Sequence, residues 1–274
     1  ENYLPVGLGA MWRLFQASCL VIFLHAEEFP EAVEEDALSL ARLEGLFTLL
    51  DSHPADGLVT WSELTTFAAA ARHGLAEKDV VTAVEEMDEN GDGFVTFDEL
   101  HGAEVEAIDD EDRNEMEQRT AEDRQLFVAA DEDQDGRLTP MELRQVLYPE
   151  THEAVLRLVA EHSLRRKDLD GDGQLSMAEF WEGDMAPGND ENGEETATFQ
   201  TLDKDGNGYL SVEELMHWES GVHHTEVAFK ELLRLCDSDK DGALSLDELT
   251  AQHQQLAHTD AAYHFLEWAE HHEL

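Results

Sequence analysis

The stretch that decides the fold is residues 131–142, which read DEDQDGRLTPME. Oxygen-bearing side chains occupy positions 1, 3, 5 and 9 of this stretch, glycine occupies position 6, an aliphatic residue position 8, and glutamate position 12. Four further segments repeat the pattern: residues 88–99 (DENGDGFVTFDE), 168–179 (DLDGDGQLSMAE), 203–214 (DKDGNGYLSVEE) and 237–248 (DSDKDGALSLDE). Five copies in one chain exclude coincidence, so this repeat organises the molecule.

The pattern is that of the EF-hand calcium loop, because Ca²⁺ takes about seven oxygen ligands and the repeat supplies them in order. Positions 1, 3 and 5 offer side-chain oxygens, position 7 a main-chain carbonyl, position 9 a contact through water, and the glutamate at position 12 both carboxylate oxygens. The predicted calcium ligands are Asp88, Asn90, Asp92, Phe94 and Glu99; Asp131, Asp133, Asp135, Arg137 and Glu142; Asp168, Asp170, Asp172, Gln174 and Glu179; Asp203, Asp205, Asn207, Tyr209 and Glu214; and Asp237, Asp239, Asp241, Ala243 and Glu248.

A sixth, degraded copy lies upstream of these five. If Gly57 and Glu63 are aligned with positions 6 and 12, Ser52 falls at position 1 and Pro54, which has no side-chain ligand, at position 3. Asp51 can serve as position 1 only if this loop is one residue longer than the others. The sequence leaves two interpretations open: residues 52–63 bind calcium, or they form a structural hand that pairs with its neighbour.

Six hands predict an all-α fold of three helix–loop–helix pairs, with short β-bridges between paired loops. Apolar residues at helical spacing, such as Leu43, Leu46, Phe47 and Leu50 before the first loop, support the flanking helices. We expect consecutive hands to pair, in residues 37–103, 124–181 and 196–258. Acidic linkers at residues 104–123 and 182–195 separate these pairs, and residues 259–274 form a C-terminal segment.

Both ends of the chain carry candidate targeting signals. With Met11 as initiator, Arg13 and the apolar run of residues 14–26 predict a secretory signal peptide over residues 1–26, followed by an acidic segment at 27–36. The alternative is a buried or membrane-anchoring helix, although the run is shorter than the roughly 20 residues of a spanning helix. The last four residues, 271–274 (HHEL), resemble the KDEL/HDEL retrieval signal and depart from it at His272.

The composition restricts the partners. The 64 acidic residues against 17 lysines and arginines give a net charge of −47, which excludes attraction to nucleic acid or to an anionic membrane surface. A hydrophobic content of 42% is too high for a chain that is disordered throughout. Because like charges crowd each loop, we expect folding to be coupled to calcium binding.

Six hands, a leader and an HxEL-type tail resemble the reticulocalbin/calumenin family. Residues 126–150 (LFVAADEDQDGRLTPMELRQVLYPE) are particularly similar to the third hand of these proteins. The resemblance implies low-affinity calcium binding in the lumen of the endoplasmic reticulum or Golgi, with secretion as a further possibility. It also implies a fold that tightens with calcium, roles in cargo folding, lumenal client proteins, a retrieval receptor at residues 271–274, and no stable membrane insertion after signal removal.

The sequence also bears on two other classes of protein, a calcium sensor and an enzyme. A cytosolic calcium sensor would expose a methionine-rich groove for target helices, but the seven methionines are scattered along the chain. An enzyme is not expected, because the sequence contains no glycine-rich phosphate loop, no HExxH and no GxSxG. The histidine pairs at 223–224 and 271–272 could hold a transition metal, but such pairs are more often solvated surface residues.

Overall fold

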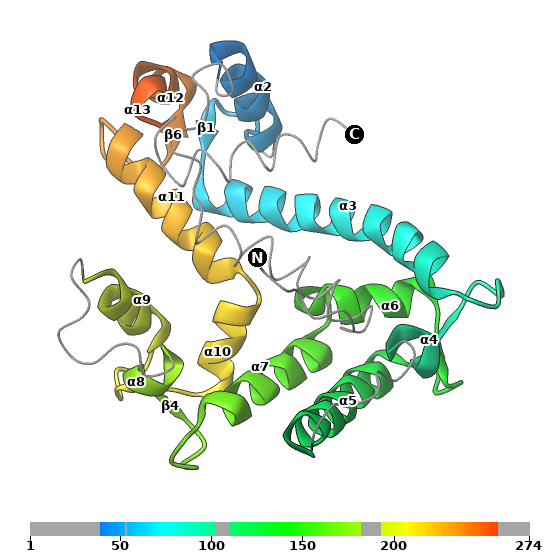
Figure 1. Cartoon of the computed structure of the whole chain (residues 1–274). Coiled ribbons are helices and arrows are strands. Elements are labelled where there is room, and N and C mark those ends of the chain that lie inside the picture. The colour runs from blue at the N-terminus through cyan, green and yellow to red at the C-terminus, as the bar shows by residue number, and fades with distance from the viewer. Residues whose placement is uncertain (1–38, 53, 102–109, 182–192, 257–274) are drawn as a thin grey trace, which may run out of the picture. The chain divides into compact units, whose positions relative to one another are not determined.

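The computed structural model describes residues 39–52, 54–101, 110–181 and 193–256 (Figure 1). The predicted signal peptide, the acidic segment at 27–36 and the C-terminal tetrapeptide lie outside these residues. Helices dominate the described chain, and its strands form three two-stranded antiparallel sheets, so the all-α prediction with short β-bridges is confirmed. Within the described ranges, no helix combines the length and the apolar character needed to cross a membrane.

Each hand consists of an entering helix, a loop with a two-residue strand, and an exiting helix. In chain order the elements of the first three hands are α2 (Leu40–Leu50), β1 (Leu58–Val59), α3 (Trp61–Met87), β2 (Val95–Thr96), α4 (Phe97–His101), α5 (Asp110–Ala130), β3 (Arg137–Leu138) and α6 (Pro140–Leu147). The rest are the 3₁₀ helix η1 (Pro149–Thr151), α7 (Glu153–Lys167), β4 (Leu175–Ser176), α8 (Met177–Phe180), α9 (Glu194–Leu202), β5 (Tyr209–Leu210), α10 (Val212–Glu219), α11 (Val222–Cys236), β6 (Leu244–Ser245), α12 (Leu246–Ala251) and α13 (His253–Leu256).

The pairing of the hands differs from the sequence-based prediction. Strand β1 pairs with β6, β2 with β3, and β4 with β5. The first hand is therefore bridged to the sixth, the second to the third, and the fourth to the fifth, so the expectation of consecutive pairs over residues 37–103, 124–181 and 196–258 is wrong. The aliphatic residues at position 8 do face one another as expected, with Val95 opposite Leu138, Leu175 opposite Leu210, and Val59 opposite Leu244.

Helix continuity explains this pairing. Helix α3 is both the exiting helix of the first hand and the entering helix of the second, and it is unbroken (Figure 1). A helix of 27 residues is about 40 Å long, so the loops at its two ends cannot bridge each other. The third and fourth hands are joined in the same way by α6, η1 and α7, which follow one another with almost no intervening residues.

The predicted acidic linkers also need correction. They connect hands that bridge each other, not successive pairs. Residues 110–123 of the first predicted linker belong to α5, which enters the third hand. In this segment the high acid content therefore accompanies a regular helix and not a chain without regular structure.

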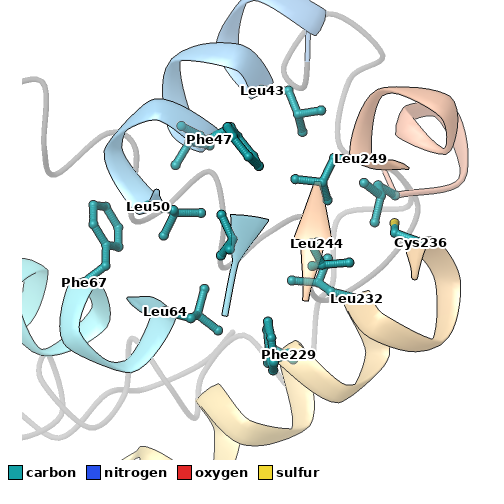
Figure 2. Close-up of a cluster of buried hydrophobic side chains, with 14 of the residues drawn as sticks. Leu43, Phe47, Leu50, Leu64, Phe67, Phe229, Leu232, Cys236, Leu244 and Leu249 are labelled. Carbon is teal, nitrogen blue, oxygen red and sulfur yellow. The ribbon is translucent and has the colours of Figure 1, made fainter. Parts of the chain in front are cut away.

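The chain divides into two compact units. One unit lies within Asp79–His223 and contains the second to fifth hands. The other unit contains the first and sixth hands, and it consists of the described residues up to Lys78 together with those from His224 onward. Figure 2 shows the core of the second of these units, where Leu50 of α2, Leu64 of α3 and Leu244 of β6 converge. Residues far apart in the sequence thus bury one another, each large side chain contributing about 1.5–3 kcal/mol.

The unit of the second to fifth hands has two further apolar clusters. One joins α3, α5 and α6 around Val95, Leu126 and Leu143. The other joins α7, α9 and α10 around Leu175, Phe199 and Leu215. Each bridged pair of hands therefore has a core of its own, which holds its two loops in place.

Candidate metal centres

The first aspartate of each of the five intact loops is held by the loop's own main chain. In every case one carboxylate oxygen accepts a hydrogen bond from the N–H of the glycine at position 6, over 2.7–3.1 Å. The backbone reaches this arrangement because the glycine is left-handed, with φ of 82° at Gly136. A side chain at this position would be strained, which explains why the repeat requires glycine there.

The residue at position 5 closes the next turn of each loop. Its side-chain oxygen accepts from the N–H of position 7 over 2.7–3.0 Å, at Asp92, Asp135, Asp172, Asn207 and Asp241. The side chains at position 7 consequently vary in their surroundings: Tyr209 is 41% exposed, whereas Ala243 is buried. This variation agrees with the prediction that position 7 contributes only its main-chain carbonyl.

The glutamate at position 12 begins the exiting helix as well as ending the loop. In the third loop its Oε2 accepts from the N–H and the hydroxyl of Thr139, and the Thr139 hydroxyl oxygen accepts from the N–H of Glu142. This capping box recurs with a serine in the fourth, fifth and sixth loops. The calcium-loop pattern predicts only a contact through water at position 9, whereas the spacing of Ser or Thr and Glu three residues apart is the sequence signal of this second role.

In four loops three carboxylates converge on one small volume. The acids of positions 1, 3 and 12 place ligand oxygens within 4.8 Å of one another. These groups are Asp131, Asp133 and Glu142; Asp168, Asp170 and Glu179; Asp203, Asp205 and Glu214; and Asp237, Asp239 and Glu248. An all-oxygen, carboxylate-rich set of this kind fits a hard cation such as Ca²⁺ and is poorly suited to softer transition metals.

The second loop achieves its arrangement differently. Asn90 replaces the acid at position 3, and its amide Nδ2 donates to Oε1 of Glu99 over 2.9 Å. In the other intact loops the same oxygen of the terminal glutamate accepts from the N–H of position 2. Both oxygens of this glutamate are thus oriented by hydrogen bonds from within its own loop.

Hydrogen bonding keeps several of these acids ionised. The N–H of Ser245, followed by its hydroxyl, lowers the pKa of Glu248 to about 2. The N–H of Thr96 lowers the pKa of Glu99, the hydroxyl of Ser176 lowers that of Glu179, and the N–H of Gly93 lowers that of Asp88. These carboxylates carry their charge at neutral pH, as a cation ligand must.

The first loop contains thirteen residues, 51–63, of which residue 53 is outside the description. Oδ1 and Oδ2 of Asp51 accept from the N–H groups of Asp56 and Gly57 over 3.0 and 2.9 Å. Asp203 accepts in the same way from positions 5 and 6 of its loop. Asp51 therefore takes the role of position 1, and the alignment that gave this role to Ser52 is wrong because the loop carries one extra residue.

One arrangement in the bridged loops was not predicted from the sequence. Arg137, at position 7 of the third loop, places Nη2 3.1 Å from Oδ2 of Asp135 and Nη1 3.9 Å from Oδ2 of Asp92 in the second loop. Its guanidinium group also lies 4.4 Å from the ring centre of Phe94. Only the bridge between the two loops brings Arg137 to Asp92 and Phe94, so the sequence offered no signal for these two contacts.

Comparison with known families agrees with this geometry. The chain matches the families described as EF-hand domain pair over residues 195–252 and 55–105, and EF hand over residues 124–147 and 162–183. Two of these matches cover hands that are consecutive in sequence, whereas the β-bridges join other partners. The matches therefore identify the hands themselves and do not determine which hands are bridged.

The chain is also similar to curated proteins of known name. It is 27% identical to mouse (Mus musculus) Reticulocalbin-2 over 72% of this chain and 65% of the relative. It is 28% identical to human (Homo sapiens) Reticulocalbin-3 over 70% of this chain and 62% of the relative. The chain thus spans slightly less than two thirds of the length of these relatives. A solved structure, of a homologue of programmed cell death 6 protein from Leishmania major Friedlin, aligns with a TM-score of 0.22 at 15% identity, over 64% of this chain and 88% of that one.

Proposed function

Because this chain belongs to the reticulocalbin/calumenin-like family of EF-hand proteins, we propose that it is a calcium buffer of the secretory-pathway lumen whose folding is coupled to calcium. The observation that carries the proposal is the convergence of three carboxylates within 4.8 Å in each of four loops. Calcium binding is its activity, and it is not an enzyme. The five intact loops would hold the ion through the residues predicted from the repeat.

Charge repulsion supports the coupling between calcium and folding. Two unit charges about 4 Å apart repel each other by about 1 kcal/mol in water and by more at a lower effective dielectric. Each of the four acidic groups contains three such pairs, and only the folded chain holds them together. A divalent cation bound to the native loop removes this penalty and stabilises the fold by mass action.

Thermal unfolding with and without calcium tests this coupling. When the free calcium concentration is 100 times the dissociation constant of a site, binding at that site adds about 2.7 kcal/mol to the free energy of unfolding. We therefore expect the Tm to rise by roughly 5–10 °C per saturated site. Circular dichroism should also report a loss of helix when a chelator removes calcium. Addition of Mg²⁺ alone is the control for a general ionic effect, and an unchanged Tm and helicity on chelation would overturn the proposal.

Dye binding separates a buffer from a sensor. A sensor exposes an apolar groove when it binds calcium and should bind an apolar dye more strongly in that state. We expect the opposite here, with less dye bound in calcium, because the ion completes the packing of each hand. An increase in dye fluorescence on calcium addition would favour the sensor.

The lumenal location and any role in cargo folding rest on the family resemblance and on the leader-like apolar run at residues 14–26. Microscopy of a copy that carries an internal tag and retains both ends of the chain tests the location. We expect colocalisation with an endoplasmic reticulum or Golgi marker, and loss of it when residues 14–26 are deleted. A diffuse cytosolic signal from the intact copy would contradict the proposed compartment.

A further inference from the structure

The first loop ends in a buried carboxylate oxygen that has no partner. Glu63 is only 6% exposed, and its Oε2 accepts from the N–H and hydroxyl of Thr60 over 2.9 and 2.8 Å. Its other oxygen, Oε1, is buried and receives no hydrogen bond. A charged oxygen that is removed from water without a partner costs free energy, so this atom points to a ligand.

The extra residue of this loop explains why Oε1 lacks a donor. In the third to sixth loops the N–H of position 2 donates to the corresponding oxygen, for example from Lys204 to Glu214 over 2.8 Å. The residue in this place in the first loop is Ser52, and its N–H instead donates to the carbonyl of Leu50 over 2.9 Å. The longer loop has thus redirected the one donor that would have satisfied Glu63.

The remaining acids of the loop keep the arrangement seen in the intact loops. Asp51 is held by the N–H groups of Asp56 and Gly57, and Oδ1 of Asp56 accepts from the N–H of Leu58 over 3.1 Å, as the position-5 residue does in every intact loop. Residues 51–63 contain three acids and no lysine or arginine. Positions 1, 5 and 12 therefore keep their carboxylates, and only position 3, where proline stands, has lost its side-chain ligand.

We propose that the first hand holds a sixth Ca²⁺ in this thirteen-residue loop, with the carboxylates of Asp51, Asp56 and Glu63 as its side-chain ligands. The main-chain carbonyl of Leu58 supplies the position-7 ligand. The proposal rests on the calcium-binding function of the other five loops and extends it to a loop that the repeat pattern does not match. With one ligand fewer, the site should be weaker than the others and fill at roughly 10⁻⁴–10⁻³ M calcium, the weak end of the EF-hand range.

Counting the calcium ions bound per chain tests the proposal. Equilibrium dialysis of the full chain against calcium above this range should give six ions for the wild type and five for Glu63→Gln. Glutamine still completes the capping box with Thr60, so the start of helix α3 is preserved. Asp51→Asn, which lies outside the helix, is the second variant and should also bind five; circular dichroism verifies that both variants fold.

Glu248→Gln provides the matched control, because the sixth loop is bridged to the first through β6 and β1. This variant should bind five ions, and the double variant Glu63→Gln/Glu248→Gln should bind four. If Glu63→Gln binds as many ions as the wild type, or if the double variant binds as many as Glu248→Gln alone, the first hand holds no ion and the buried oxygen has only a water partner. If Glu248→Gln also leaves the count unchanged, the calcium function proposed for the intact loops has failed instead.

Discussion

At the scale of single residues, the terminal glutamate of each loop serves the helix and the ion site at once. Glu142 caps the start of α6 through Oε2, and its Oε1 accepts from the N–H of Glu132 over 3.0 Å. Loss of the N-cap residue of such a box, which is Thr139 here, costs about 0.5–2 kcal/mol independently of any ion. A glutamine at this position separates the two roles, because it can keep the capping contact but loses the charge that a calcium ligand needs.

Arg137 is expected to weaken calcium binding in two loops. Its positive charge lies beside Asp135 and Asp92, which are predicted ligands of the third and second loops. Exposed ion pairs are worth about 0.2–1 kcal/mol, so Arg137→Gln should tighten calcium binding at these loops by a factor of about 1.4 to 5. A calcium titration that follows the amide resonances of Gly93 and Gly136 measures both loops separately.

Lys204→Gln is the control for Arg137→Gln, because it removes the same charge from the fifth loop. Lys204→Gln should leave the calcium midpoints of the Gly93 and Gly136 amide resonances unchanged. If both variants shift these midpoints equally, the effect belongs to the net charge of the chain and not to the contacts of Arg137.

Cys236 should report whether the last loop is folded. Its side chain is 2% exposed, and burial, followed by the nearby charge of Glu248, raises its pKa to about 11. Relative to its ordinary value of 9.0, this reduces the thiolate fraction at neutral pH about 100-fold. We expect alkylation of a Cys19→Ser variant to be slow in calcium and to accelerate at least to this extent after chelation; equal rates in the two conditions would show that the core stays closed without calcium.

At the scale of helices and strands, the packing of α5 against α7 contains a buried histidine. Nε2–H of His162 on α7 donates to Oε1 of Gln125 on α5 over 2.9 Å. Burial lowers the pKa of His162; Glu122 opposes this shift, whereas Arg165 and Arg166 reinforce it. Glu122 itself lies 3.5 Å from Nη1 of Arg166, so ionic contacts surround the histidine.

This histidine should make stability depend on pH. Since the folded pKa of His162 lies below its unfolded value of about 6.5, the unfolded chain binds more protons below that pH. The contribution of neutral His162 to the free energy of unfolding is fully present above pH 6.5, and it is lost as the pH falls through the folded pKa. Unfolding of wild type and His162→Gln at saturating calcium should show a shallower acid slope in the variant, and parallel slopes would contradict this assignment.

An element could be predicted from the sequence when the interactions that form it join residues close together in the chain. The loops are set by contacts within a dozen residues, such as Gly136 N–H to Asp131 at a distance of 3.0 Å, so the pattern of residue types was sufficient. The register of the first loop was not predictable, since the choice between Asp51 and Ser52 depends on how the main chain accommodates an extra residue. The helical character of residues 110–123 was obscured by their acid content.

At the scale of the whole molecule, the order of the hands in the chain differs from their order in the bridges. The first and sixth hands share a core in which Leu64 and Leu232 are almost completely buried (Figure 2). The second and third hands share another core, around Leu143. Calcium sites that are distant in sequence should therefore be coupled energetically, whereas sites that are neighbours in sequence are coupled only where a bridge joins them.

Core substitutions test this coupling. Leu64→Ala in the first hand removes a buried side chain at a cost of about 2–5 kcal/mol and should weaken calcium binding in the sixth loop. The calcium midpoint of the Gly242 amide should rise, while that of Gly93 should stay constant. Leu143→Ala in the third hand is the matched control: it should raise the calcium midpoint of the Gly93 amide and leave that of Gly242 constant. If Leu64→Ala shifts the calcium midpoint of Gly93, the result favours consecutive pairing.

The all-α fold built from EF-hands, the five intact loops and their predicted ligands all follow from the order of residue types along the chain. These features depend on residues that are close together in the chain, so the spacing of acids and glycines carries them. Three features became apparent only in the folded chain: which hands are bridged, that Asp51 begins the first loop, and that Oε1 of Glu63 is buried without a donor. These features depend on which helices continue without a break and on where main-chain N–H groups point, and both are settled only when the chain has folded around its cores.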